Sequence, residues 1–175
     1  MIDPATVTAI TGLILKALEL VHKRREGSLN EQEAKDLYCK IFSSLLFEVH
    51  QNLDRCRMFL EDFYQRGRTA GGILSFFVRD VLFSDFCIMC PEPSVISDLN
   101  EIYSGFERMH HWQRVTTDLG SGSAGLIIGF AGAMFRRNLH LQYNTLLGVL
   151  KELCPDTAAP PEFDPSTIPN QALES

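Results

Sequence analysis

The sequence has little concentrated positive charge. Its 16 lysines and arginines are outnumbered by 22 aspartates and glutamates, which gives a net charge of -6. The only tight basic runs are Lys23-Arg24-Arg25 and Arg136-Arg137. Because nucleic-acid binding needs clustered cations to neutralise phosphates, this balance argues against nucleic acid as a partner.

Motifs for catalysis and nucleotide binding are also lacking. The sequence contains no Gly-x-Ser-x-Gly nucleophile elbow, no Walker loop and no dinucleotide-binding fingerprint. Gly67, Gly71 and Gly72 fall between two expected helices rather than between a strand and a helix, which argues against a phosphate cradle. We therefore expect a protein that is not an enzyme, with no cofactor and no evident small-molecule substrate.

Cysteine is present without a disulfide pattern. Five cysteines, an odd number with no regular spacing, fit a reducing compartment better than a disulfide framework. The start of the chain, Met1-Ile2-Asp3, carries an acid where a secretory signal would carry positive charge. We expect a cytoplasmic location, or the inner membrane surface if the first helix binds lipid.

No apolar run is long enough to span a membrane. The segment from Leu119 to Phe135 carries no charge, but its strictly apolar part is about 11 residues, whereas a spanning helix needs about 20. We expect this segment to be buried in protein, with Gly125 and Gly129 at a close crossing with the second or third helix. The alternative is a seam for self-association or membrane insertion.

What the sequence does have is helical spacing of apolar residues. From Ala34 to Phe63 an apolar residue recurs every three or four positions, as on one face of a helix. Leu29, Asn30 and Glu33 form a staple and capping box at its start. Glu48 and Asn52, four residues apart beside the apolar face, are interpreted as a satisfied polar pair at the edge of the core.

The fold predicted from these patterns is all-α. We expect an elongated bundle of four to five helices, because a helix of about 30 residues is about 45 Å long and needs others beside it. We expect the bundle, residues 1–155, to form a single domain. The Pro-rich tail, residues 156–175, is expected to be disordered or extended, since it has too little apolar content to fold alone. The expected helices cover about 5–25, 31–66, 73–90, 95–117 and 124–153.

A few residues have the spacing of metal ligands. Glu19 and His22, and likewise Glu107 and His110, form Glu-x-x-His pairs of the kind found in di-iron bundles. Cys87-x-x-Cys90 could supply half of a zinc site, but it lies at the C-terminal end of its helix, the wrong end for a thioredoxin-type redox pair. Buried thiols and ordinary polar residues are the simpler interpretation.

The leading hypothesis is a non-enzymatic interaction or assembly protein that binds a partner chain or copies of itself. Its surfaces would be the third helix, which is apolar nearly all round, and the Gly-rich half of the fifth, with Gly125, Ile128 and Gly129. The first alternative is a bundle that binds or inserts into membranes through the amphipathic N-terminal helix, with Leu13 and Ile14, and segment 120–135. The second is a di-iron or zinc-binding bundle.

Overall fold

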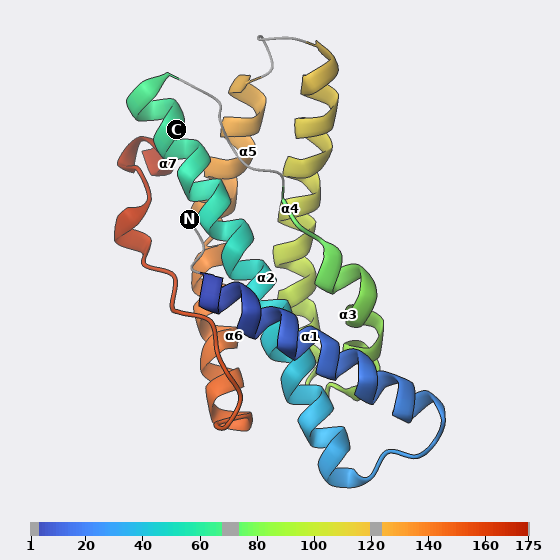
Figure 1. Cartoon of the computed structure of the whole chain (residues 1–175). Helices are drawn as coiled ribbons and strands as arrows, with labels where there is room; N and C mark the ends of the chain where they lie inside the picture. Colours follow the sequence, from blue (N-terminus) through green and yellow to red (C-terminus); the bar gives the residue numbers. More distant parts are fainter. Residues whose placement is uncertain (1–3, 68–73, 120–123, 175) are drawn as a thin grey trace.

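The predicted all-α bundle is confirmed. The computed structural model describes residues 4–67, 74–119 and 124–174, and these ranges contain helices and no strand (Figure 1). The fold is elongated, and α2 runs through most of its length (Figure 1). The elements are α1 (Pro4–Arg25), α2 (Glu31–Arg66), α3 (Phe77–Met89), α4 (Pro93–Leu119), α5 (Ala124–Arg136), α6 (Leu139–Leu153), the short 3-10 helix Pro165–Thr167 and α7 (Asn170–Glu174).

The central helix α2 begins and ends where the sequence predicts. The Asn30 side chain accepts a hydrogen bond from the Glu33 backbone N–H at 2.9 Å, and the Glu33 carboxylate accepts one from the Asn30 N–H at 3.2 Å. Gly67 ends the helix in the left-handed conformation, with φ 62°, which glycine adopts without a steric penalty. Apolar residues along α2, from Leu37 to Leu60, form the middle of the core and contact α1, α3, α5 and α6.

The predicted third helix begins later than expected, and the predicted fifth helix is two helices. Helix α3 starts at Phe77, and the expected start at residue 73 lies outside the described residues. Asn138 interrupts the fifth helix by adopting a left-handed conformation with φ 59°. Asparagine tolerates this conformation better than other residues with a side chain, so the chain can end α5 and start α6 there.

The Pro-rich tail is docked on the bundle, and of the two states expected for it, disordered or extended, the extended one describes its first part. The second part of the tail forms the 3-10 helix and α7 (Figure 1). Phe163, Ile168 and Ala172 are all buried. The tail lacks the apolar content to fold alone, but these side chains are enough to hold it against a surface that the bundle already provides.

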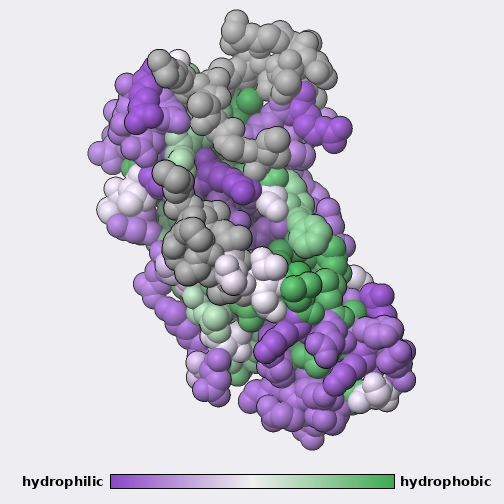
Figure 2. Space-filling view, in the orientation of Figure 1, coloured by the Kyte–Doolittle hydropathy of each residue, from purple (hydrophilic) through white to green (hydrophobic). Residues whose placement is uncertain are grey.

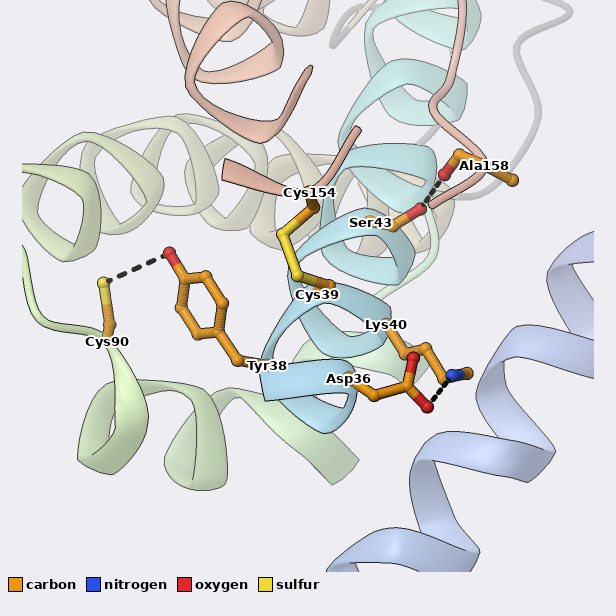
Figure 3. The surroundings of a disulfide bond; sticks show 8 residues. All are labelled: Asp36, Tyr38, Cys39, Lys40, Ser43, Cys90, Cys154 and Ala158. Atoms are coloured by element: carbon orange, nitrogen blue, oxygen red, sulfur yellow. Dashed lines mark hydrogen bonds and ion pairs between the residues drawn. A yellow bond between two sulfur atoms is a disulfide. The ribbon is translucent and has the colours of Figure 1, made fainter. Parts of the chain in front are cut away.

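A disulfide ties the end of α6 to α2 (Figure 3). It joins Cys39 to Cys154, which are 115 residues apart in the sequence, while Cys56, Cys87 and Cys90 are free. The cysteine spacing did not predict this bond. Since disulfides persist mainly in oxidising compartments, the bond counts against the expected cytoplasmic location, which stays a prediction.

No helix within residues 4–67, 74–119 and 124–174 is long and apolar enough to cross a bilayer.

Candidate interaction surface

The structure does not bring the two Glu-x-x-His pairs together. Glu19 and His22 lie exposed on α1, where His22 Nε2 is 3.1 Å from a Glu26 carboxylate oxygen. Glu107 on α4 forms an ion pair with Arg79 instead. No group of three or more His, Cys, Asp or Glu side chains could hold a metal ion in the described parts of the chain.

The Cys87-x-x-Cys90 motif lies at the C-terminal end of α3, as predicted. Cys90 is the residue that follows the helix, and its Sγ atom lies 4.0 Å from the Tyr38 hydroxyl (Figure 3). Burial raises the pKa of the Cys87 thiol, and the neighbouring Cys90 raises it further. A raised pKa disfavours the reactive thiolate form of Cys87.

The predicted polar pair of α2 positions the start of α3. The Glu48 carboxylate accepts hydrogen bonds from the Val78 and Arg79 backbone N–H groups, at 2.9 and 3.0 Å. It also accepts bonds from the Ser75 and Tyr103 hydroxyls, each at 3.1 Å. Phe76, which precedes α3, offers no side-chain cap, so Glu48 supplies from another helix what a local capping residue would supply.

Burial sets the electrostatics of this carboxylate. Loss of solvent raises the pKa of Glu48, while the hydrogen bonds from Val78, Arg79, Tyr103 and Ser75 oppose the rise. Asn52, one turn further along α2, accepts a bond from the Ser75 N–H at 2.9 Å and donates one to the Ser75 carbonyl at 2.7 Å. The interpretation as a satisfied pair is confirmed. The sequence could not reveal the partners of the pair at the start of α3, because they lie more than 20 residues away.

Ion pairs fix α3 on both flanks. Toward α4, Arg79 pairs with Glu107, and its guanidinium carbon lies 5.6 Å from the centre of the Tyr103 ring. Toward α1, the buried Asp85 carboxylate is 3.0 Å from the Arg24 guanidinium and 3.4 Å from that of Arg25. Buried acids are rarely left without such partners. These contacts, with the Glu48 cap, determine which face of α3 points outward.

The outward face of α3 is apolar. Phe77, Val81 and Ile88 have 60%, 39% and 67% of their surface exposed, and Ser84 lies between them on the same face. Hydrophobic surface over α3 is visible on the right of the molecule in Figure 2. Single exposed apolar residues are ordinary, but several on one face of a short helix are typical of a binding surface. We call these four residues the outer face of α3.

A polar cleft adjoins the N-terminal end of this face. It has a volume of about 680 Å³ and lies between the start of α3 and the middle of α4. Its charges are mixed, so the cleft has no strong preference for an anion or a cation. The Nδ1 atom of His110 is buried there with no hydrogen-bond partner among the described residues. The lining residues are Phe76, Arg79, Asp80, Glu107, His110, His111 and Arg114.

The other predicted interaction residues divide into buried and open positions. Leu13 and Ile14 are half-buried on α1, and Ile14 packs against the core. Ile128 is buried as well. Gly125 and Gly129 are exposed, and a methyl group added at either would meet nothing within 4 Å. The predicted close crossing at these glycines is therefore wrong.

Gly125 and Gly129 are exposed because a different face of α5 packs against the core. Ile127, Ile128 and Ala131 offer more apolar surface than the glycines do, and they are the residues that face the core. Helical spacing shows that two faces exist, but the neighbouring helices decide which one turns inward.

Comparison of the chain with protein-family models, with curated proteins and with solved structures finds no match.

Proposed function

We propose that the protein is a non-enzymatic interaction protein that assembles with a second copy of itself through the outer face of α3. The observation that carries the proposal is the exposure of Phe77, Val81 and Ile88 on one face of a helix that is otherwise held in place from three sides. A surface that is both apolar and rigid loses little conformational entropy when it binds.

The spacing of the outer face suits another helix of the same kind. Phe77, Val81, Ser84 and Ile88 are separated by four, three and four residues, which is the spacing of a coiled-coil seam. Ser84, in the middle of the seam, is small enough to let two helices approach closely. The seam is short, so the expected dimer is weak and concentration-dependent rather than permanent.

Charges beside the seam favour a second copy over an unrelated partner. In two parallel helices, a residue beside the seam faces the position five residues further along its partner. For Asp80 of one copy, that position is Asp85 of the other. The Asp85 carboxylate lies beside the guanidinium groups of Arg24 and Arg25. The Arg25 side chain is 71% exposed and could contact Asp80 of the second copy. Related by two-fold symmetry, the two copies would form this contact twice.

Sedimentation velocity from about 10 µM to about 1 mM tests the assembly. We expect the parent protein to dimerise over this range and Val81→Glu to weaken the dimer at least about tenfold, because a buried unpaired charge opposes association. Leu141→Glu, at an exposed apolar residue of α6, is the matched control and should behave like the parent. A parent that stays monomeric, or two variants that weaken assembly equally, would contradict the proposal.

A charge exchange tests the arrangement of the two copies. Arg25→Glu alone should weaken the dimer, since it faces Asp80 across the expected interface. The double variant Arg25→Glu/Asp80→Arg should restore association, because the same pair then has its signs reversed. Failure of this rescue in a folded double variant would rule out the parallel arrangement.

A further inference from the structure

One of the buried side chains that hold the tail on the bundle is the aromatic ring of Phe163. This ring is stacked on Phe135 at the end of α5, with the ring centres 5.7 Å apart. Two imidazole rings complete the site: His50 of α2 at 6.3 Å and His140 of α6 at 6.1 Å. Asn144 fixes the backbone, because its side chain accepts a bond from the Phe163 N–H at 2.9 Å and donates one to the Phe163 carbonyl at 3.0 Å.

Both histidines are poorly placed to carry a charge. Only 5% of His140 is exposed, and its Nδ1 atom is buried with no hydrogen-bond partner in the described residues. Burial lowers the pKa of His140 and also that of His50. An imidazolium at either position would be deprived of water beside an aromatic ring, so the docked tail favours the neutral imidazole.

Few charged groups surround this site. Asp54, one turn after His50, partly offsets the effect of burial on the pKa of His50. Arg136 lines the same cavity as His140, and a second cation there would be unfavourable. Of the acids beside Phe163 in the tail, Glu162 pairs with Lys151, and Asp164 accepts a bond from the Ser166 N–H. Neither acid is paired with an imidazole.

Beyond Phe163 the tail is held by contacts that do not titrate near neutral pH. Arg136 donates a hydrogen bond to the Ala172 carbonyl at 2.7 Å, and the buried Ala172 lies against Gly132 of α5. Ile168, which lies between Phe163 and Ala172 in the sequence, is buried as well. At the other end, the disulfide at Cys154 holds the root of the tail on α2. Between Cys154 and Phe163, Ser43 donates a hydrogen bond to the Ala158 carbonyl, and the Tyr143 hydroxyl donates one to the Pro161 carbonyl at 2.6 Å. Movement of the tail is therefore limited to residues 162–174.

We propose that residues 162–174 are a pH-sensitive strap: protonation of His50 and His140 releases Phe163, and then Ile168 and Ala172, while the helical bundle stays folded. Docking is complete when both imidazoles are neutral, above their ordinary pKa of about 6.5. Docking weakens as the pH falls below this value, toward the lower pKa values that both imidazoles have in the docked state. Release uncovers the face of α5 around Gly132 and Phe135, a surface separate from the outer face of α3.

Hydrogen exchange of backbone amides tests the strap, with rates corrected for the intrinsic effect of pH. From about pH 7.5 to about pH 5, protection of the Phe163, Ile168 and Ala172 amides should fall at least about tenfold. The amides of α2 should keep theirs. Unchanged protection of the tail, or an equal loss in α2, would overturn the proposal, since either would show that the tail does not move by itself.

Variants separate the two histidines from other titrating groups. His50→Phe/His140→Phe should keep the tail protected at about pH 5, because neither ring can then gain a proton. His22→Phe, at an exposed position of α1, is the matched control and should release its tail like the parent. If the double variant does not fold, the single variants provide the same test, and each should reduce the pH effect. Release that no histidine variant reduces would overturn the assignment.

Discussion

Removal of the Cys39–Cys154 disulfide should lower the stability of the bundle by a large amount. The bond closes a loop over 115 residues of sequence, which restricts the unfolded chain far more than a short loop would. The chain-entropy relation gives about 5 kcal/mol for a loop of this length. Domains of this size have a net stability of about 5–15 kcal/mol, so the loss is a third of the total or more.

The measurement is urea unfolding with and without reductant, followed by circular dichroism. The reduced protein should unfold at a much lower urea concentration, and its melting temperature should fall by about 10–20 °C. Cys39→Ala/Cys154→Ala should behave like the reduced parent and should not respond to reductant. Alanine is suitable because both cysteines are buried and a serine hydroxyl would lack a partner. Cys87→Ala, which removes a free thiol, is the control and should leave the reductant effect intact.

Two results would refute this reasoning. One is an unfolding midpoint that reductant does not change. The other is a thiol count on the unfolded, unreduced protein: the structure predicts three reactive thiols, and five would mean that the bond is absent.

Other predictions concern single side chains. Glu48→Gln should destabilise the fold by about 1–3 kcal/mol in urea unfolding, because the new amide N–H group faces backbone donors at the start of α3. Glu31→Gln, on the exposed first turn of α2, should change little, and an equal loss in both variants would contradict the capping role. Asn138→Val should lower the free energy of unfolding by about 1–2 kcal/mol, because a β-branched residue resists the left-handed conformation. Asn138→Gly should be neutral or stabilising. Thermal melts of the two variants measure the difference.

The parts of the fold that local rules determine could be predicted from the sequence. The bounds of α2 follow from Asn30, Glu33 and Gly67, each of which acts within a few residues of the helix end. The break between α5 and α6 was missed because apolar spacing continues across it. The signal available was Arg136-Arg137-Asn138, since basic residues followed by asparagine are typical of a helix C-terminus.

Features that depend on distant contacts could not be predicted. The disulfide joins residues 115 apart, and the site of Phe163 includes His50 from a segment more than 100 residues away, so spacing within one segment does not predict either contact. The third helix was expected to be an interaction surface because it is apolar nearly all round. Glu48 and Asp85 determine which face of α3 is exposed to solvent, and both make their contacts between α3 and other helices.

Dependence on Glu48 makes α3 a conditional helix. Thirteen residues are too few for a stable helix in isolation, and this one has no capping side chain of its own. An excised peptide of this segment should therefore be a random coil, and during folding α3 should appear only after α2. A protein in which α2 is disrupted could not form α3 and therefore could not present its outer face. Binding through that face would then require the whole bundle to be folded.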